Sequence, residues 1–153
     1  MPTTDEDKKF LAVAIAEARL GRSEGGIPIG AALVVDGNVL AGGHNRRVQH
    51  GSAIHHGETN ALENAGRQSA SVYARSTMYT TLSPCHMCTG AILLYKIPRV
   101  VIGENRTFMG AEELLRLNGV EVVVLNDETC VAMMEEFIAA EPRLWNEDIG
   151  EDD

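Results

Sequence analysis

The stretch TMYTTLSPCHMCTGAILLYK, residues 77–96, joins a strand-like run to a helix-like run through Ser83 and Pro84. The run TMYTTL is rich in β-branched and aromatic residues, which is typical of a β-strand. The following residues, 85–96, are largely apolar and predict a helix that stops before Pro98. The run RVVIG, residues 99–103, predicts the next strand. A strand, a helix and a strand therefore follow one another here, with two cysteines at the start of the helix.

The rest of the chain continues this alternation on both sides. We predict further helices over residues 5–20, 56–66, 111–119 and 127–141, and further strands over 29–35, 39–41 and 121–125. Asp36 and Gly37 predict a tight hairpin turn, and residues 42–54 a long polar loop. The pattern indicates an α/β protein, a three-layer α/β/α sandwich around a mixed sheet of about five strands. We expect one domain over residues 1–153, with an acidic tail over 142–153.

Composition narrows the range of partners. The 153 residues include 22 acidic and 13 basic side chains, which gives a formal net charge of −9. Such a chain, which has no basic cluster, is a poor partner for nucleic acid. No apolar run is long enough for a membrane span, no signal peptide is visible, and three cysteines do not suggest a disulfide framework. We therefore expect a cytoplasmic protein without a membrane partner.

The pair Cys85 and Cys88 has three possible meanings: a redox dithiol, part of a structural metal site, or part of a catalytic metal site. A redox pair is expected in a thioredoxin-like β-α-β unit near the start of the fold, and this pair comes late. A structural zinc site needs four ligands, and Cys130 is isolated in the sequence. A catalytic zinc site needs three, and His56 is a candidate for the third. Glu58 could then serve as an acid/base group.

The motifs HGE (56–58) and PCHMC (84–88) resemble those of the zinc-dependent cytidine deaminase superfamily. Within it, the chain looks most like the fungal-type cytosine deaminases, which act on the free base. The similarity extends over nearly the whole chain. It includes EGGIPIGAAL (24–33), GHN (43–45), GSAIHHGE (51–58), LENAGR (62–67), YTTLSPCHMCTGAI (79–92), GEN (103–105), EVVV (121–124) and WNEDIGE (145–151).

This resemblance implies a zinc ion held by His56, Cys85 and Cys88. It further implies that Glu58 moves protons while water replaces the amino group of cytosine, which yields uracil and ammonia. The adjacent His55 is a rival ligand, but only His56 has the H-x-E spacing.

The resemblance also implies a set of residues that bind a small nucleobase-like substrate: Asn45, Gly57 and Asp148 for polar contacts, and Ile29, Phe108 and Trp145 as apolar walls. Trp145 would belong, with Ile149, to a C-terminal lid formed by residues 142–153. A homodimer is expected from the family and from the apolar residues of the predicted helices over 86–95 and 128–140.

Two departures keep other substrates open. His86 stands between the cysteines where fungal cytosine deaminases typically have Asp, and residues 59–61 also differ from the fungal pattern. Deamination of creatinine, isocytosine or guanine is therefore an alternative. Further alternatives are a tRNA adenosine deaminase, a thiol redox protein and a non-catalytic zinc-binding module.

Overall fold

The computed structural model describes residues 4–152, and its five strands form one mixed sheet in the order β2-β1-β3-β4-β5. β1 (Gly30–Val35) pairs antiparallel with both β2 (Asn38–His44) and β3 (Ser76–Leu82). β4 (Arg99–Glu104) and β5 (Glu121–Val124) continue the sheet parallel to β3. The predicted mixed sheet of about five strands is confirmed.

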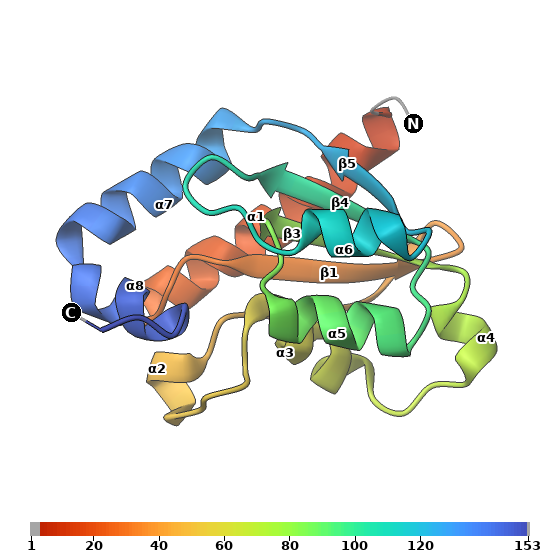
Figure 1. Ribbon diagram of the computed structural model, residues 1–153, viewed down its shortest axis with the longest axis horizontal. Helices are drawn as coiled ribbons and strands as arrows, with labels where there is room; N and C mark the ends of the chain where they lie inside the picture. The colour runs from red at the N-terminus through yellow and green to blue at the C-terminus, as the bar shows by residue number, and fades with distance from the viewer. Residues whose placement is uncertain (1–3, 153) are drawn as a thin grey trace.

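Helices cover both faces of this sheet, as predicted for a three-layer sandwich. α1 (Asp5–Ser23) and α7 (Glu128–Ala140) pack on one face, where Phe10 and Cys130 join a single buried cluster. The other face is covered by three helices: α3 (Gly57–Ala65), α5 (His86–Leu94) and α6 (Glu112–Leu117). In Figure 1, α5 and α6 lie on the viewer's side of the strands, and α1 runs behind them.

The hairpin between β1 and β2 turns where it was predicted to turn. Asp36 and Gly37 have positive φ angles of 51° and 78°, as a two-residue turn of the I′ type requires. β2 is longer than the predicted strand over 39–41, because Gly42 and Gly43 continue the pairing with β1 instead of opening a loop. A Cβ at Gly43 would lie 2.4 Å from the backbone nitrogen of Ala61, so glycine allows α3 to pack directly on this strand.

Three short helices lie in segments for which we predicted no regular structure. α2 (Arg47–His50) falls in the predicted polar loop, and α4 (Ala70–Tyr73) precedes β3. α8 (Pro142–Asp148) occupies the predicted acidic tail. Pro142 stands at the first turn of α8, where a proline is tolerated, and Trp145 anchors the helix in a buried cluster with Ile29. No helix in residues 4–152 has the length and apolar content that a bilayer crossing demands.

The two helices on which we based the expected dimer differ in their packing. α7 buries Val131, Met134 and Phe137 within the chain, so this part of the expectation was wrong. Its apolar residues are covered by the sheet and by α8. α5, by contrast, leaves Met87 and Leu94 exposed.

Asp7 fastens the start of α1 to the sheet. Asp7 and Thr4 together cap the helix. The carboxylate of Asp7 accepts hydrogen bonds from both terminal nitrogens of Arg99 on β4, at 2.7 and 2.8 Å. It also accepts a hydrogen bond from the hydroxyl of Tyr79 on β3, at 2.8 Å. Burial opposes ionisation of this side chain, but the hydrogen bonds from Arg99 and Tyr79 outweigh it and lower the pKa of Asp7 to about 2.

We therefore expect Asp7→Asn to reduce the free energy of unfolding by about 2 kcal/mol at neutral pH, because it removes a charged acceptor of buried hydrogen bonds. A carboxyl with a depressed pKa stabilises the fold above its ordinary value of 3.8 and loses this effect as the pH falls toward 2. Urea unfolding at several pH values should thus show a weaker acid dependence in the variant.

The control is Asp36→Asn, which breaks an exposed ion pair with Arg75 and keeps a residue that tolerates the positive φ angle. It should cost less than about 1 kcal/mol. Equal losses in the two variants would contradict the role of Asp7.

Candidate metal centre and active site

His56, Cys85 and Cys88 meet where two helices begin. His56 is the N-cap residue of α3 and Cys85 the N-cap residue of α5, both with extended backbone, and Cys88 lies in the first turn of α5. The Nδ1 atom of His56 lies 3.4 Å from Sγ of Cys85 and 3.7 Å from Sγ of Cys88. α5 starts just after β3 ends at Leu82, so the site lies at the carboxyl edge of the parallel strands.

These three atoms fit a zinc ion. They all lie within 4.8 Å of one another, and they form the one such group of metal-ligating atoms among residues 4–152. Tetrahedral zinc with ordinary Zn–N and Zn–S bond lengths separates its nitrogen and sulfur ligands by about 3.6 Å, which agrees with both measured distances. Three protein ligands leave the fourth position of a tetrahedral ion for water or substrate, as in catalytic sites.

The thiolate of Cys85 favours a bound cation. The hydrogen bond from the Cys88 thiol lowers the pKa of Cys85 to about 4 in spite of burial, and the pKa of Cys88 rises because its proton is shared with the Cys85 thiolate. Burial works against a charged His56, but the Cys85 sulfur and then the Asp148 carboxylate raise the pKa of His56 to about 9. Metal ligands are deprotonated, so a bound cation displaces protons from His56 and Cys88.

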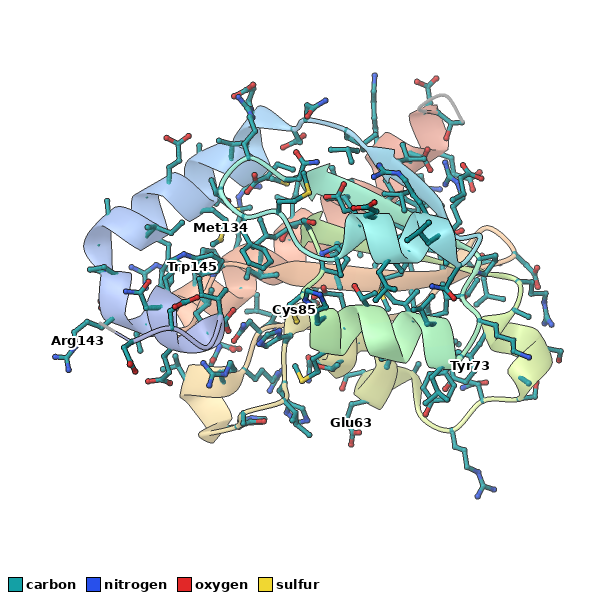
Figure 2. All side chains as sticks on the ribbon, in the orientation of Figure 1. Glu63, Tyr73, Cys85, Met134, Arg143 and Trp145 are labelled. Carbon is teal, nitrogen blue, oxygen red and sulfur yellow. The ribbon has the colours of Figure 1, made fainter. Side chains whose placement is uncertain are left out.

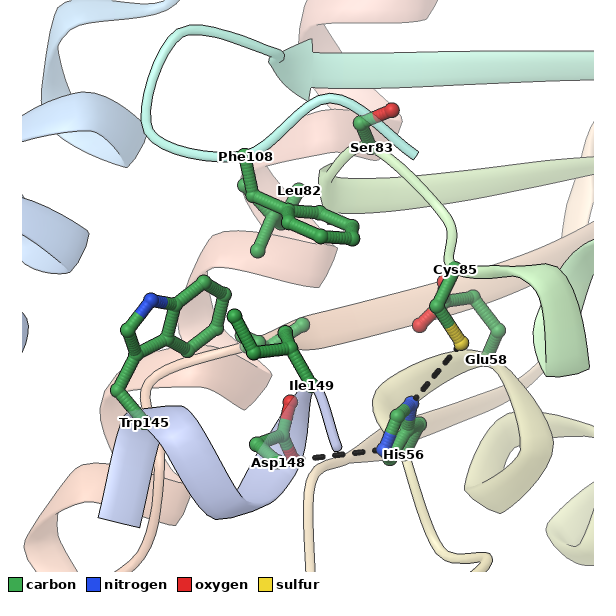
Figure 3. Close-up of a pocket in the computed structure, with 10 residues that line it drawn as sticks. His56, Glu58, Leu82, Ser83, Cys85, Phe108, Trp145, Asp148 and Ile149 are labelled. Atoms are coloured by element: carbon green, nitrogen blue, oxygen red, sulfur yellow. Dashed lines mark hydrogen bonds and ion pairs between the residues drawn. The ribbon is translucent and has the colours of Figure 1, made fainter. Parts of the chain in front are cut away.

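Glu58 lies in the first turn of α3 and is 4% exposed. Burial, reinforced by the negative charge on Cys85, raises the pKa of Glu58 to about 7. A carboxyl with a pKa near neutrality can both accept and return a proton. Glu58 borders the same cavity as His56 and Cys85, as Figure 3 shows, so it is placed to exchange protons with a molecule bound there.

Asp148 brings α8 into the site. Its Oδ1 atom lies 3.3 Å from Nε2 of His56 and accepts a hydrogen bond of 2.8 Å from Nδ2 of Asn45. Burial raises the pKa of Asp148 against the opposing influence of His56 and Asn45. The side-chain oxygen of Asn45 accepts from the backbone N–H of Arg47. Asn45 and Asp148, which are 103 positions apart, thus form one hydrogen-bonded unit beside the metal ligand.

A small cavity opens beside this cluster. Phe108 and Trp145 meet edge to face across it, with ring centroids 5.8 Å apart (Figure 3). Seven of the predicted residues line the cavity: Ile29, His56, Glu58, Cys85, Phe108, Trp145 and Asp148. Asn45, Gly57 and Cys88 are not among the described residues that line it. Asn45 is hydrogen-bonded to Asp148, and Gly57 lies close to Ile29, since a Cβ at Gly57 would come within 3.3 Å of the carbonyl oxygen of Ile29.

Leu82 and Ser83 also line the cavity, and we did not predict either. The hydroxyl of Ser83 donates to Glu112 at 2.6 Å and accepts from the backbone N–H of Gly110 at 2.9 Å. It thereby ties down the loop that carries Phe108. Their position in the sequence could have indicated this role, because both residues directly precede Pro84 and Cys85 in the stretch that joins the strand to the helix.

Comparison with known proteins agrees with this geometry. The family described as the cytidine and deoxycytidylate deaminase zinc-binding region matches residues 4–104, which include all three candidate ligands and Glu58. The chain belongs to this family. As in the family's description, the protein is a zinc-binding deaminase, a hydrolase that acts on carbon–nitrogen bonds.

Individual relatives extend the match beyond that region. Cytosine deaminase of Candida albicans is 58% identical over 149 residues, which are 97% of this chain and 99% of the relative. The tRNA-specific adenosine deaminase of Bacillus subtilis is 32% identical over 142 residues, 86% of this chain and 88% of the relative.

Solved structures share the fold. A guanine deaminase from Nitrosomonas europaea superposes with a TM-score of 0.70 at 20% identity, over 91% of this chain and 87% of that one. A deaminase of the tRNA wobble position superposes with a TM-score of 0.70 at 26% identity, over 82% of this chain and 99% of that one.

We expect Cys88→Ser to weaken zinc binding by more than about a hundredfold, because loss of a ligand should exceed the loss caused by removing a supporting residue. Zinc affinity can be measured by competition with a chromophoric chelator. Zinc added to the stripped wild-type protein should also release protons, and the variant should release fewer. Cys130→Ala removes the third thiol, which lies buried on α7 away from the ligands, and should retain zinc. An equal loss in that control would contradict the assignment.

Proposed function

We propose that the protein deaminates a free nucleobase, cytosine, to uracil and ammonia. The observation that carries the proposal is the joint position of a Cys₂His ligand set and a buried glutamate beside one small cavity. The identity of 58% with a cytosine deaminase over nearly the full length of both chains supports this substrate. Such an activity would place the protein in pyrimidine salvage.

The chemistry divides between the metal and one carboxylate. Zinc, when bound by His56, Cys85 and Cys88, supplies a Lewis acid that makes water nucleophilic at neutral pH. Glu58 takes the proton from the attacking water and passes it to the ring nitrogen next to the reacting carbon. It then takes the proton of the new hydroxyl group on that carbon and gives it to the departing amino group, so one side chain serves as base and acid in turn. Its burial and its pKa of about 7 suit both steps.

Binding of the ring falls to the remaining residues of the site. Asp148 presents a buried carboxylate to the cavity and would accept from a ring N–H, while Asn45 holds that carboxylate and would share the polar edge of the base. The backbone N–H of Gly57, at the N-terminus of α3, is available to a carbonyl oxygen. Ile29, Phe108 and Trp145 would enclose the flat ring, because they are the apolar walls of the cavity.

The cavity favours a single ring. Its accessible volume of about 20 Å³ is far below the roughly 300–1,000 Å³ of ordinary ligand sites, so it suits a small molecule. The departures from the fungal pattern lie outside it. His86 is exposed at the outer mouth of the site, Thr59 bonds the backbone of His56, and Asn60 accepts from the backbone of His44. These substitutions therefore support no change of substrate.

The acidic charge of −9 argues against a tRNA substrate.

We also propose that α8 is the lid of a single-domain enzyme. Trp145, Asp148 and Ile149 all reach the cavity from this helix, and Figure 2 shows Trp145 on α8, facing toward the start of α5 where Cys85 lies. Substrate entry then requires α8 or the Phe108 loop to move. Closure would exclude water and strengthen the electrostatic contacts around the reacting ring.

Glu58→Gln should lower kcat for cytosine by roughly 100-fold to 10,000-fold, because it removes the proton shuttle and keeps the shape of the side chain. Ammonia release should be measured with cytosine, isocytosine, guanine, creatinine and cytidine. Zinc content should stay near one ion per chain, since Glu58 is not a ligand.

Cytosine should be the best substrate, and cytidine should fail because its ribose does not fit the closed cavity. Faster turnover of another ring would replace cytosine in the proposal. Full activity of Glu58→Gln would refute the proposed chemistry. An activity that survives a metal chelator but is abolished by thiol alkylation would indicate a thiol redox protein instead.

We further propose that the protein is a homodimer formed through α5. Met87, Leu94 and Tyr95 project from this helix and its end with exposed fractions of 36%, 69% and 42%, and Ile54 beside them is 60% exposed. A groove between α3 and α5 adds Leu62 and Ala91 to this apolar face. The resemblance to the family suggests that the partner is a second copy of this chain. An exposed apolar face of this kind suits the centre of a dimer interface.

Leu94→Asp should convert a dimer into a monomer in sedimentation velocity, because it places a charge on the most exposed apolar side chain of this face. Leu20→Asp, on α1 in the opposite layer, introduces the same charge at a residue that is 48% exposed and should leave the dimer intact. A monomeric wild-type protein at micromolar concentration would disprove the dimer.

The three cysteines, all free thiols, fit a reducing compartment, and we propose the cytoplasm as the location.

A further inference from the structure

Glu104, the last residue of β4, is a buried side chain that binds the loop following the strand. Its Oε2 atom accepts hydrogen bonds from the backbone N–H groups of Arg106 and Thr107, at 2.8 and 2.9 Å. Its Oε1 atom accepts from the hydroxyl of Thr107. The guanidinium of Arg106 donates instead to Glu128 of α7, at 2.7 Å. Burying a carboxyl group at 0% exposure is unfavourable unless its oxygens are hydrogen-bonded, and the loop itself supplies the donors.

These contacts do not require a particular charge on Glu104. Oε2 can accept from both N–H groups in the ionised and in the neutral carboxyl, because the hydroxyl of Thr107 can either donate to Oε1 or accept from it. A glutamine at this position could form the same set of bonds. Its oxygen would accept from the two N–H groups, and its NH₂ group would donate to the hydroxyl. Glu104 therefore serves as an acceptor for the backbone of the loop, whatever its charge.

The other end of the loop is fixed by a second buried carboxyl group, that of Glu112 on α6. Glu112 accepts a hydrogen bond from the hydroxyl of Ser83, which accepts in turn from the backbone N–H of Gly110. The backbone N–H of Ala111 donates to the carbonyl of Pro84 at 3.0 Å. A Cβ at Gly110 would overlap that carbonyl oxygen, so glycine allows the close approach. The loop is thus held against the segment that leads into α5.

Phe108 lies between these two attachments, directly after Thr107. Its ring reaches the cavity and meets Trp145 edge to face, at a centroid distance of 5.8 Å (Figure 3). Phe108 is partly buried and its neighbour Met109 is 59% exposed, so packing alone holds this part of the loop weakly. The position of the Phe108 ring therefore depends on the hydrogen bonds at the two ends of the loop.

We propose that Glu104 is a positioning residue for substrate binding: it holds the backbone of residues 106 and 107 so that Phe108 stays over the cavity, forms a wall for the flat base and covers Trp145. The inference rests on the proposed function, since it takes this cavity as the site of a free base. Glu104 is not among the described residues that line the cavity, so it acts through the loop.

Loss of the acceptor should release the loop. The N–H groups of Arg106 and Thr107 are partly buried, and without Glu104 they would have to reach water to be satisfied. Phe108 would move with them and uncover Trp145. An apolar wall contacts the ring in the ground state and in the transition state alike, so its loss should raise KM more than it lowers kcat.

The first measurement uses the fluorescence of Trp145, which is the only tryptophan of the chain, in the zinc-loaded, full-length protein. Acrylamide should quench the wild-type protein weakly, because Trp145 is 6% exposed. In Glu104→Leu the quenching constant should rise severalfold as Phe108 withdraws. Glu104→Gln, which keeps the hydrogen bonds, should be quenched like the wild type. Unchanged quenching in a folded Glu104→Leu protein, or an equal rise in Glu104→Gln, would overturn the inference.

The second measurement is the kinetics of cytosine deamination. Glu104→Leu should raise KM roughly tenfold with a smaller change in kcat, and Glu104→Gln should restore the wild-type KM. Glu113→Leu makes the same substitution at an exposed carboxylate of α6 and should leave KM and quenching unchanged. A fall in kcat at constant KM in Glu104→Leu would contradict a role in forming the wall of the site.

Thr107→Val tests the same contact with a smaller change, in case Glu104→Leu does not fold. It removes one hydrogen bond and keeps the shape of the side chain, so KM should rise roughly threefold and quenching should increase. Wild-type values for both quantities in Thr107→Val would overturn the inference. Absence of cytosine turnover in the zinc-loaded wild type would instead contradict the proposed function. The two failures are distinguishable, because the quenching of Trp145 does not require turnover.

Discussion

The active site depends on the meeting of two helix N-termini at one edge of the sheet. His56 and Cys85 are the N-cap residues of α3 and α5, and their side-chain ligand atoms lie 3.4 Å apart. N-cap residues lie where unpaired backbone N–H groups and the positive end of the helix dipole favour thiolates and bound anions. The same two helix starts thus favour the thiolate of Cys85 and place Glu58 beside the metal ligands.

Close packing keeps these helix ends in place. α3 lies directly on β2 because Gly43 has no side chain, and α1 lies directly on β1, where a Cβ at Gly30 would come within 2.1 Å of the carbonyl oxygen of Ala14. On the far side of the cavity, Ser83 holds the loop of Phe108, and α8 supplies Trp145 and Asp148. The cavity is therefore bounded by segments from most of the chain, and a shift in any layer would change its shape.

Prediction from sequence was most successful where one local pattern carries the signal. The strand–turn–helix order around Cys85, the turn at Asp36 and Gly37 and the alternation of helices and strands all follow from residues close together in the chain. It was least successful for β2 and α8. For β2, we ended the predicted strand at the glycines, although pairing of the backbone needs no side chain. For α8, the acidic residues suggested a solvated tail, but Trp145 anchors this helix in the core.

The α/β class and the candidate ligand types could be predicted from the chain alone, because they depend on residue chemistry and on patterns between residues close together in the sequence. The contacts between distant groups become visible in the folded protein alone. Asp148 contacts His56 and also Asn45, which is 103 positions away in the sequence, and His44 lies between Glu17 and Glu24 of another layer. No local pattern specifies such contacts, because they arise from the packing of whole helices against the sheet.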